Sequence, residues 1–195
     1  MRCATRSAEE TERLGAAVGR LLEQGDVVLL IGPLGAGKTT FVRGLARGLG
    51  FEGDVTSPTF TLSHVYRGRV PLVHADLWRL ERMAEIEQLA LDEEVEEGSS
   101  ALVIEWGEAA EPIFGGRALT VEIESGESPD LRTFSFRPSG EWEGRSTALA
   151  GAAAAGAEDG TGPARKEGAA AAEDGTGPAA EEGTGPTDEG GGGQG

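Results

Sequence analysis

The sequence contains few of the residues on which whole classes of protein depend. Its 195 residues include one cysteine, Cys3, which excludes an internal disulfide and leaves no cysteine-based metal site. Acidic residues outnumber Lys and Arg by 34 to 17 and no basic block is present, which disfavours direct tight binding of nucleic acid. No apolar run is long enough to span a bilayer, and the N-terminus lacks the apolar segment of a signal peptide. We therefore expect a cytoplasmic protein with no membrane partner.

Large apolar side chains are almost missing from the end of the chain. After Trp142 the only one is Leu149, and the stretch "AEDGTGPA" occurs twice beyond that leucine. Such a composition buries too little apolar surface to offset the entropy of ordering the backbone. The sequence therefore predicts one folded domain over residues 1–138 and a disordered, acidic, repetitive tail rich in Gly, Ala and Pro over residues 139–195.

Hydrophobic periodicity in residues 1–138 predicts alternating helices and strands. Ser7, followed three residues later by Glu10, forms a capping-box pattern that starts a helix ending by Gly25. Further helices are expected over residues 39–49 and 77–98. Apolar or β-rich runs predict strands over residues 27–31, 58–66, 70–76, 101–106, 117–125 and 131–138, the last two as an antiparallel pair. This order predicts an α/β fold with a mixed sheet flanked by helices.

Lysine is also scarce, and its placement is informative. Lys38 is the only lysine before residue 139, and it lies in "GPLGAGKTT", between a predicted strand and a predicted helix. This stretch fits the P-loop pattern G-x-x-x-x-G-K-[ST], whose glycines let backbone N–H groups approach phosphates. Lys38 would reach the β- and γ-phosphates, and the Thr39 hydroxyl would ligate Mg²⁺. The expected nucleotide-binding residues are Leu34, Gly35, Ala36, Gly37, Lys38, Thr39 and Thr40.

Two carboxylates follow two of the predicted strands. Asp76 ends the run "VPLVHAD", and Glu105 ends "ALVIE". Acids delivered by the ends of neighbouring strands toward one phosphate site can hold Mg²⁺ and orient water, so we assign both as metal-site and catalytic residues beside Lys38. Asp76 could instead cap the helix that follows it.

The segment "TSPTF" follows the P-loop helix, where the switch loops of P-loop proteins meet the γ-phosphate. Thr56, Ser57 and Thr59 are therefore candidate switch residues. A simple turn around Pro58 is an equally good interpretation, since Ser and Pro favour turns.

Two tryptophans, two histidines and one arginine have less specific interpretations. Trp78 and Trp106 are expected to be packing residues, and His64 and His74, which lack metal-ligand spacing, to be structural or surface groups. Arg132 is expected at an exposed strand position rather than on the nucleotide.

In this order, the stretches "GPLGAGKTTFVRGL", "TSPTFTL", "HADLWRL" and "VIEWGE" resemble the TsaE family of bacterial P-loop ATPases. The resemblance runs from about Ser7 to Pro138. It implies a role in forming threonylcarbamoyladenosine at position 37 of tRNAs that read codons beginning with A. It also implies ATP and Mg²⁺ as cofactors, the TsaB–TsaD pair as partner, and contact with tRNA only through that complex.

Carried over by motif, the resemblance gives individual roles to residues of the site. Thr39 and Glu105 would ligate Mg²⁺, and Asp76 would assist the metal or the attacking water. The segment around Ser57 would act as the switch, and Trp106 would serve in stacking or partner contact. The long repetitive tail has no counterpart in the family pattern.

Two other functions remain open on the residues alone. A small-molecule kinase shares the P-loop, but it usually adds an arginine-bearing lid, and here Arg79, Arg82 and Arg117 are scattered. A non-catalytic partner protein could use ATP only as a structural ligand. A GTPase is disfavoured because the N-K-x-D element that reads guanine needs a lysine, and no further lysine precedes residue 139.

Overall fold

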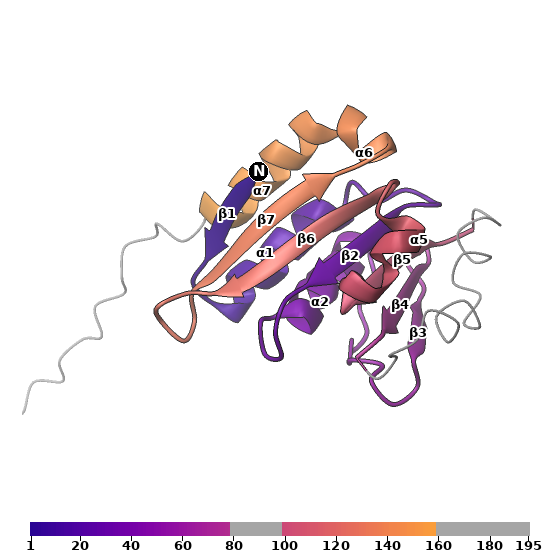
Figure 1. Cartoon of the computed structure of the whole chain (residues 1–195), viewed down its shortest axis with the longest axis horizontal. Helices are drawn as coiled ribbons and strands as arrows, with labels where there is room; N and C mark the ends of the chain where they lie inside the picture. Colours follow the sequence, from indigo (N-terminus) through magenta and orange to yellow (C-terminus); the bar gives the residue numbers. More distant parts are fainter. Residues whose placement is uncertain (79–98, 159–195) are drawn as a thin grey trace, which may run out of the picture. The chain divides into compact units, whose positions relative to one another are not determined.

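The computed structural model describes residues 1–78 and 99–158 (Figure 1). By its internal contacts the chain divides into Met1–Gly162 and Pro163–Gly195, and every described residue belongs to the first part. The helix predicted over residues 77–98 falls outside the described residues except for its first two positions, and residues 159–195 of the predicted tail fall outside them entirely. No helix in the described ranges is both long and apolar enough to cross a membrane.

Within the described ranges, seven strands form one mixed sheet in the order β1-β7-β6-β2-β5-β4-β3. The central strands β6, β2, β5 and β4 run parallel, while β3 pairs antiparallel with β4, and β7 pairs antiparallel with both β6 and β1. The strands are β1 (Arg2–Thr5), β2 (Val27–Ile31), β3 (Ser63–Tyr66), β4 (Leu72–Asp76), β5 (Ala101–Glu105), β6 (Ala118–Ser125) and β7 (Arg132–Pro138).

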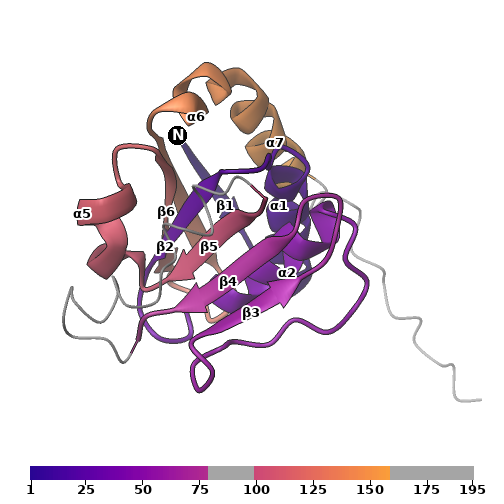
Figure 2. The same cartoon turned by 90° about the vertical axis from the view of Figure 1, so that its right-hand side faces the viewer.

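Helices cover both faces of this sheet, as Figures 1 and 2 show from two sides. Successive side chains of β2 point to opposite faces of the sheet and so belong to two different core clusters. Val28 and Leu30 pack with helices α1, α2 and α7, whereas Val27 and Leu29 pack with η1 and α5. All four side chains are fully buried, as expected for a central parallel strand. The helices are α1 (Ala8–Gly19), α2 (Lys38–Gly48), η1 (Gly107–Ala110), α5 (Glu111–Phe114), α6 (Glu141–Gly144) and α7 (Ser146–Glu158).

The predicted α/β fold with a mixed sheet is confirmed, and most of its elements are found within a few residues of the expected bounds. The capping pattern holds, because the Glu10 backbone N–H donates to the Ser7 hydroxyl at 3.1 Å, although α1 already ends at Gly19. The predicted strand over 58–66 is shorter than expected, since only Ser63–Tyr66 pairs with β4. The short edge strand β1 was not predicted from the sequence.

The predicted domain boundary at residue 139 is wrong, because residues 141–158 form α6 and α7 and pack on the domain. Trp142 and Leu149 are fully buried, and the Arg145 guanidinium donates to the buried Asp26 carboxylate while lying 4.0 Å from the Trp142 ring centroid. Small residues make this packing close: a Cβ on Gly156 would come within 2.6 Å of the Leu14 Cα. Close backbone approach thus buries a helix that has few large side chains.

Candidate functional site

The P-loop connects β2 to α2 and has the backbone that its glycines allow. Gly35 and Gly37 have φ angles of 77° and 106°, and Gly37 is the N-cap of α2. Side chains with a Cβ rarely adopt these angles, so glycine is required for the turn. Arg132, at the start of β7, donates to the Ala36 and Gly35 carbonyls at 3.0 and 3.3 Å. The expectation that Arg132 is a merely exposed strand residue is therefore wrong: it braces the loop.

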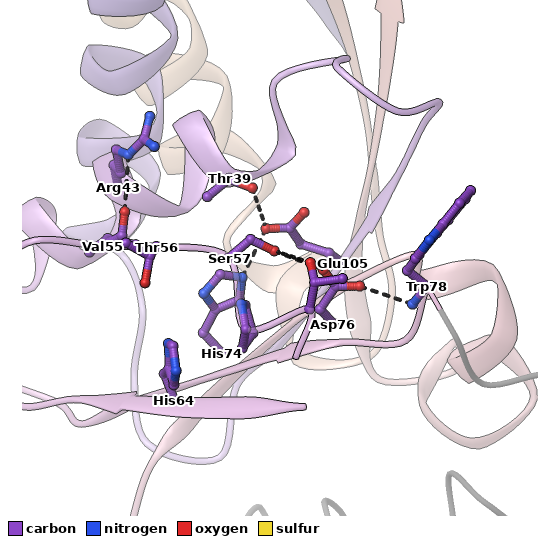
Figure 3. Close-up of polar contacts among 12 residues, drawn as sticks. Thr39, Arg43, Val55, Thr56, Ser57, His64, His74, Asp76, Trp78 and Glu105 are labelled. Carbon is purple, nitrogen blue, oxygen red and sulfur yellow. Dashed lines mark hydrogen bonds and ion pairs between the residues drawn. The ribbon is translucent and has the colours of Figure 1, made fainter. Parts of the chain in front are cut away.

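Strand register brings the two predicted carboxylates together beside this loop. Asp76 ends β4 directly opposite Glu105 at the end of β5, and Glu105 in turn pairs with Leu30 of β2. Both acids are 3% exposed. The Thr39 hydroxyl, in the first turn of α2, donates to Glu105 Oε1 at 2.8 Å. Glu105 is therefore connected directly to the P-loop helix, as Figure 3 shows.

Asp76 connects instead to the predicted switch segment. The hydroxyls of Ser57 and Thr59 donate to Asp76 Oδ2 at 2.8 and 2.6 Å. The other oxygen, Oδ1, accepts a hydrogen bond of 2.9 Å from the Trp78 backbone N–H (Figure 3). The second contact is the local side-chain-to-backbone bond that a capping role would use, so Asp76 makes both kinds of contact considered from the sequence.

Lys38 is buried in the site at 4% exposure. Its ammonium donates to the Gly32 and Pro33 carbonyls at 2.6 and 3.0 Å and lies 3.7 Å from the Trp106 ring centroid. Burial lowers the pKa of Lys38 below its ordinary value, while the carboxylates of Glu105, Glu108 and Asp76 oppose that shift. Two buried carboxylates face this one ammonium, so the site carries an excess of negative charge that a cation would offset.

Trp106 is the N-cap of η1 and has a left-handed backbone, φ 61° and ψ 45°. In this strained conformation the Trp106 ring contacts two groups of the site. One is the Lys38 ammonium, and the other is the Trp78 ring, whose centroid lies 4.3 Å from that of Trp106. Trp78, which is 51% exposed, forms the outer member of this stack. The tryptophans therefore belong to the site and do more than fill the core.

These groups line one cleft of about 340 Å³. Of the predicted site residues, all but Thr56 reach it; the Thr56 carbonyl lies outside and accepts a hydrogen bond from the Tyr66 hydroxyl. Sequence reasoning did not predict Arg43, which lines the cleft and donates to the Val55 carbonyl at 3.1 Å. Its position one helical turn after Thr39 on the P-loop helix was the available signal. The cleft is lined by Leu34, Gly35, Ala36, Gly37, Lys38, Thr39, Thr40, Arg43, Ser57, Thr59, Asp76, Trp78, Glu105 and Trp106.

The donor set of the cleft fits a hard divalent cation together with a polyphosphate. The Thr39 hydroxyl and the carboxylates of Glu105 and Asp76 are oxygen donors, the type that Mg²⁺ prefers. In the part of the chain that is described, no group of three His, Cys, Asp or Glu side chains is placed to hold a metal by itself. A cation here would therefore need further oxygens from phosphate and water, as Mg²⁺ does in nucleotide sites.

Comparison with known proteins identifies the family. The model of the family "Threonylcarbamoyl adenosine biosynthesis protein TsaE" matches residues 5–133. A tRNA threonylcarbamoyladenosine biosynthesis protein TsaE of Treponema pallidum is 54% identical over 108 residues, covering 55% of this chain and 79% of that protein. The protein of the same name from Mycobacterium bovis is 40% identical over 134 residues, covering 64% and 79%.

A solved structure agrees with the sequence matches. The crystal structure of Bacillus subtilis YdiB superposes with a TM-score of 0.66 at 32% identity, covering 77% of this chain and 93% of that chain. The family match ends before α6 and α7 but includes the P-loop, the switch segment and both carboxylates. The chain therefore belongs to the TsaE family, which takes part in the biosynthesis of threonylcarbamoyladenosine in tRNA.

Proposed function

We propose that this protein is a weak, Mg²⁺-dependent ATPase whose cycle regulates or resets the TsaB–TsaD complex during threonylcarbamoyl transfer to adenosine 37 of tRNA. The observation that carries the proposal is the Thr39–Glu105 contact of 2.8 Å beside the P-loop. It joins a hydroxyl that follows the P-loop lysine to a buried carboxylate on the neighbouring strand. This pairing is what a nucleotide-bound Mg²⁺ requires of a P-loop site.

Each residue of the cleft has a distinct task in this proposal. Gly35 and Gly37 shape the loop around the phosphates, and Lys38 leaves the Gly32 and Pro33 carbonyls to bind the β- and γ-phosphates. Thr39 and Glu105 would hold Mg²⁺, and the ion would supply positive charge against the charge that develops on the phosphates. Asp76, which accepts hydrogen bonds from two hydroxyls of the switch segment, would orient the attacking water.

The same geometry supports a switch. Ser57 and Thr59 both donate to Asp76 Oδ2, so a change at Asp76 is felt by two residues of one loop. When the site is filled, Asp76 would give up bonds to these hydroxyls, and the loop that carries Ser57 and Thr59 would rearrange and dock on the TsaB–TsaD pair. Contact with tRNA would occur only through that complex, because the acidic chain has no basic block.

Turnover by the protein alone should be slow. Two arginines in the described ranges lie near the phosphate loop, and both are engaged: Arg43 donates to the Val55 carbonyl and Arg132 to carbonyls of the loop. Arg132 gives all three of its guanidinium nitrogens to backbone carbonyls and is therefore unavailable to a transferring phosphate, whereas Arg43 is held through its Nε on the Val55 carbonyl. An activating arginine supplied by a partner can be worth about 10³–10⁵ in rate.

The test is phosphate release from ATP, measured for the protein alone and with a purified TsaB–TsaD pair. Slow turnover that rises sharply with the pair is the expected result. Lys38→Ala should abolish ATP binding, and Glu105→Ala should leave binding detectable while it removes turnover. An unchanged rate in Glu105→Ala refutes its catalytic role, and a rate indifferent to the pair refutes the partner assignment.

The same assay separates the other functions left open by the sequence. A kinase would transfer phosphate to an added small-molecule acceptor in place of water. A structural ATP site would bind ATP without turnover under either condition. We favour the ATPase because Asp76 and Glu105 are both buried and hydrogen-bonded at the phosphate site, an arrangement that structural binding alone does not need.

A further inference from the structure

His74 is fully buried on β4, two residues before Asp76. Since side chains alternate along a strand, His74 and Asp76 point to the same face of the sheet. The imidazole Nε2 lies 2.9 Å from Glu105 Oε1, the same oxygen that accepts from Thr39 (Figure 3). Glu105 is therefore held from two sides, by the P-loop helix and by β4.

The other edge of the His74 ring faces Tyr66. Nδ1 lies 3.5 Å from the Tyr66 hydroxyl, and the two ring centroids are 6.0 Å apart. The Tyr66 hydroxyl donates its proton to the Thr56 carbonyl at 3.0 Å. Burial raises the pKa of Tyr66, so the phenol stays protonated and remains a donor. Because that proton is given to Thr56, Tyr66 and His74 meet as packed rings with their polar edges 3.5 Å apart, with a hydrogen bond on either side of the pair. A path of contacts thus runs from Thr39 through Glu105, His74 and Tyr66 to the first residue of the switch segment.

Resting on the proposed function, we infer that His74 is a positioning residue that fixes Glu105 for Mg²⁺ and, through Tyr66, transmits the state of the nucleotide site to Thr56. The switch segment is then attached at both ends of its length. Thr56 is held through Tyr66, whereas Ser57 and Thr59 are held by Asp76. The first attachment runs from His74 on β4 through Tyr66 on β3, and the second runs directly from Asp76 on β4.

The contact between His74 and Glu105 is shielded from water. His74 is completely shielded and the Glu105 side chain is 5% exposed, so water cannot replace their contact. Removing the histidine would leave a buried carboxylate oxygen with one protein donor instead of two. His64, the strand neighbour of His74 on β3, differs in burial and in one partner. It is only partly buried, and its Nε2 lies 2.8 Å from the hydroxyl of the exposed Thr61, although its Nδ1 also lies 3.5 Å from the Tyr66 hydroxyl.

Three substitutions separate the two ends of the path. His74→Gln places an amide donor near the position of Nε2, so it keeps a bond to Glu105 and loses the nitrogen that faces Tyr66. His74→Asn places its amide near Nδ1 and loses Glu105. Tyr66→Phe removes only the hydroxyl and keeps the ring that packs on Phe51. His64→Gln is the matched control for the Glu105 end alone, since this neighbouring histidine contacts Tyr66 and Thr61.

Two measurements use ADP, with and without Mg²⁺, as the probe. Calorimetry gives the factor by which Mg²⁺ raises ADP affinity, and hydrogen exchange gives the protection of residues 56–61 on binding. We expect His74→Asn to reduce the Mg²⁺ effect about tenfold. His74→Gln and Tyr66→Phe should keep that effect within about threefold of the unmodified protein and lose at least half of the change in exchange. His64→Gln should leave the Mg²⁺ effect unchanged; it is not a control for the exchange of residues 56–61, because His64 contacts both Thr61 and Tyr66.

The outcomes distinguish this inference from the proposed function. A normal Mg²⁺ effect in His74→Asn overturns the positioning of Glu105, and a normal exchange response in both His74→Gln and Tyr66→Phe overturns the link to Thr56. If a histidine variant does not fold, as judged by circular dichroism, Tyr66→Phe alone decides the link. Failure of the unmodified protein to bind ADP at all would refute the proposed function and, with it, this inference.

Discussion

Replacement of Leu149 by alanine tests whether α7 is part of the folded domain. Leu149 is fully buried in the core cluster shared by α1, α2 and the sheet. Leu→Ala at such positions costs about 2–5 kcal/mol, more where the surroundings cannot collapse into the cavity. Here α7 is already in backbone contact with α1 at Gly156, which prevents it from moving closer. We therefore expect a loss of about 3–5 kcal/mol in the free energy of unfolding, out of the roughly 5–15 kcal/mol typical of a domain.

The assay is urea unfolding followed by tryptophan fluorescence, with the free energy extrapolated to zero urea. The matched control is Thr147→Ala, an exposed position on the same helix, where the change should stay within about 0.5 kcal/mol. If Leu149→Ala loses less than about 1 kcal/mol, α7 does not pack as described.

Three further predictions concern single groups. Asp26→Ala should cost about 3 kcal/mol in urea unfolding, because it leaves Arg145 without the carboxylate that accepts two of its hydrogen bonds; an unchanged midpoint would contradict this. Arg132→Lys should weaken ADP binding by on the order of tenfold in calorimetry, because lysine cannot bond the Ala36, Gly35 and Pro129 carbonyls together. Burial raises the pKa of Cys3 from 9.0 to about 11, so near pH 8 iodoacetamide should react about a hundredfold more slowly than in denaturant. The same shift favours the folded state fully below pH 9, and this contribution should fall as the pH rises toward 11; equal alkylation rates in both states would refute the assigned burial.

Local patterns in the sequence predicted the P-loop side of the fold well. The strand, glycine loop and helix around Lys38 follow from short-range residue preferences, and so does the capping of α1 by Ser7. Asp76 and Glu105 were predicted as neighbours because the carboxyl ends of adjacent parallel strands meet at one edge, and their register confirms it.

The features that the sequence did not predict depend on contacts between distant residues. Strand β1 is only four residues long and exists because it pairs with β7, more than a hundred residues away. Helix α7 has almost no large side chains, so composition indicated disorder, whereas small residues here permit close packing against Leu14. The contact between His74 and Glu105 could not be predicted, because no spacing within the segment of His74 points to a residue 31 positions away. The two side chains meet because β4 pairs in parallel with β5.

The hydrogen bonds of Glu105 and Asp76 indicate different roles for the two carboxylates. Glu105 shares one oxygen between Thr39 and His74, and it is therefore coupled to the P-loop helix. Asp76 has one oxygen occupied by two switch hydroxyls and the other by the Trp78 backbone. Asp76 accepts hydrogen bonds on both oxygens, so it would have to give up donors before it could bind a cation directly. Glu105 instead accepts from Thr39, whose hydroxyl is the type of oxygen that can bind the same cation. Under the proposed function, Glu105 and Thr39 would therefore be the direct ligands of Mg²⁺, and Asp76 would connect the water and the switch segment to the nucleotide.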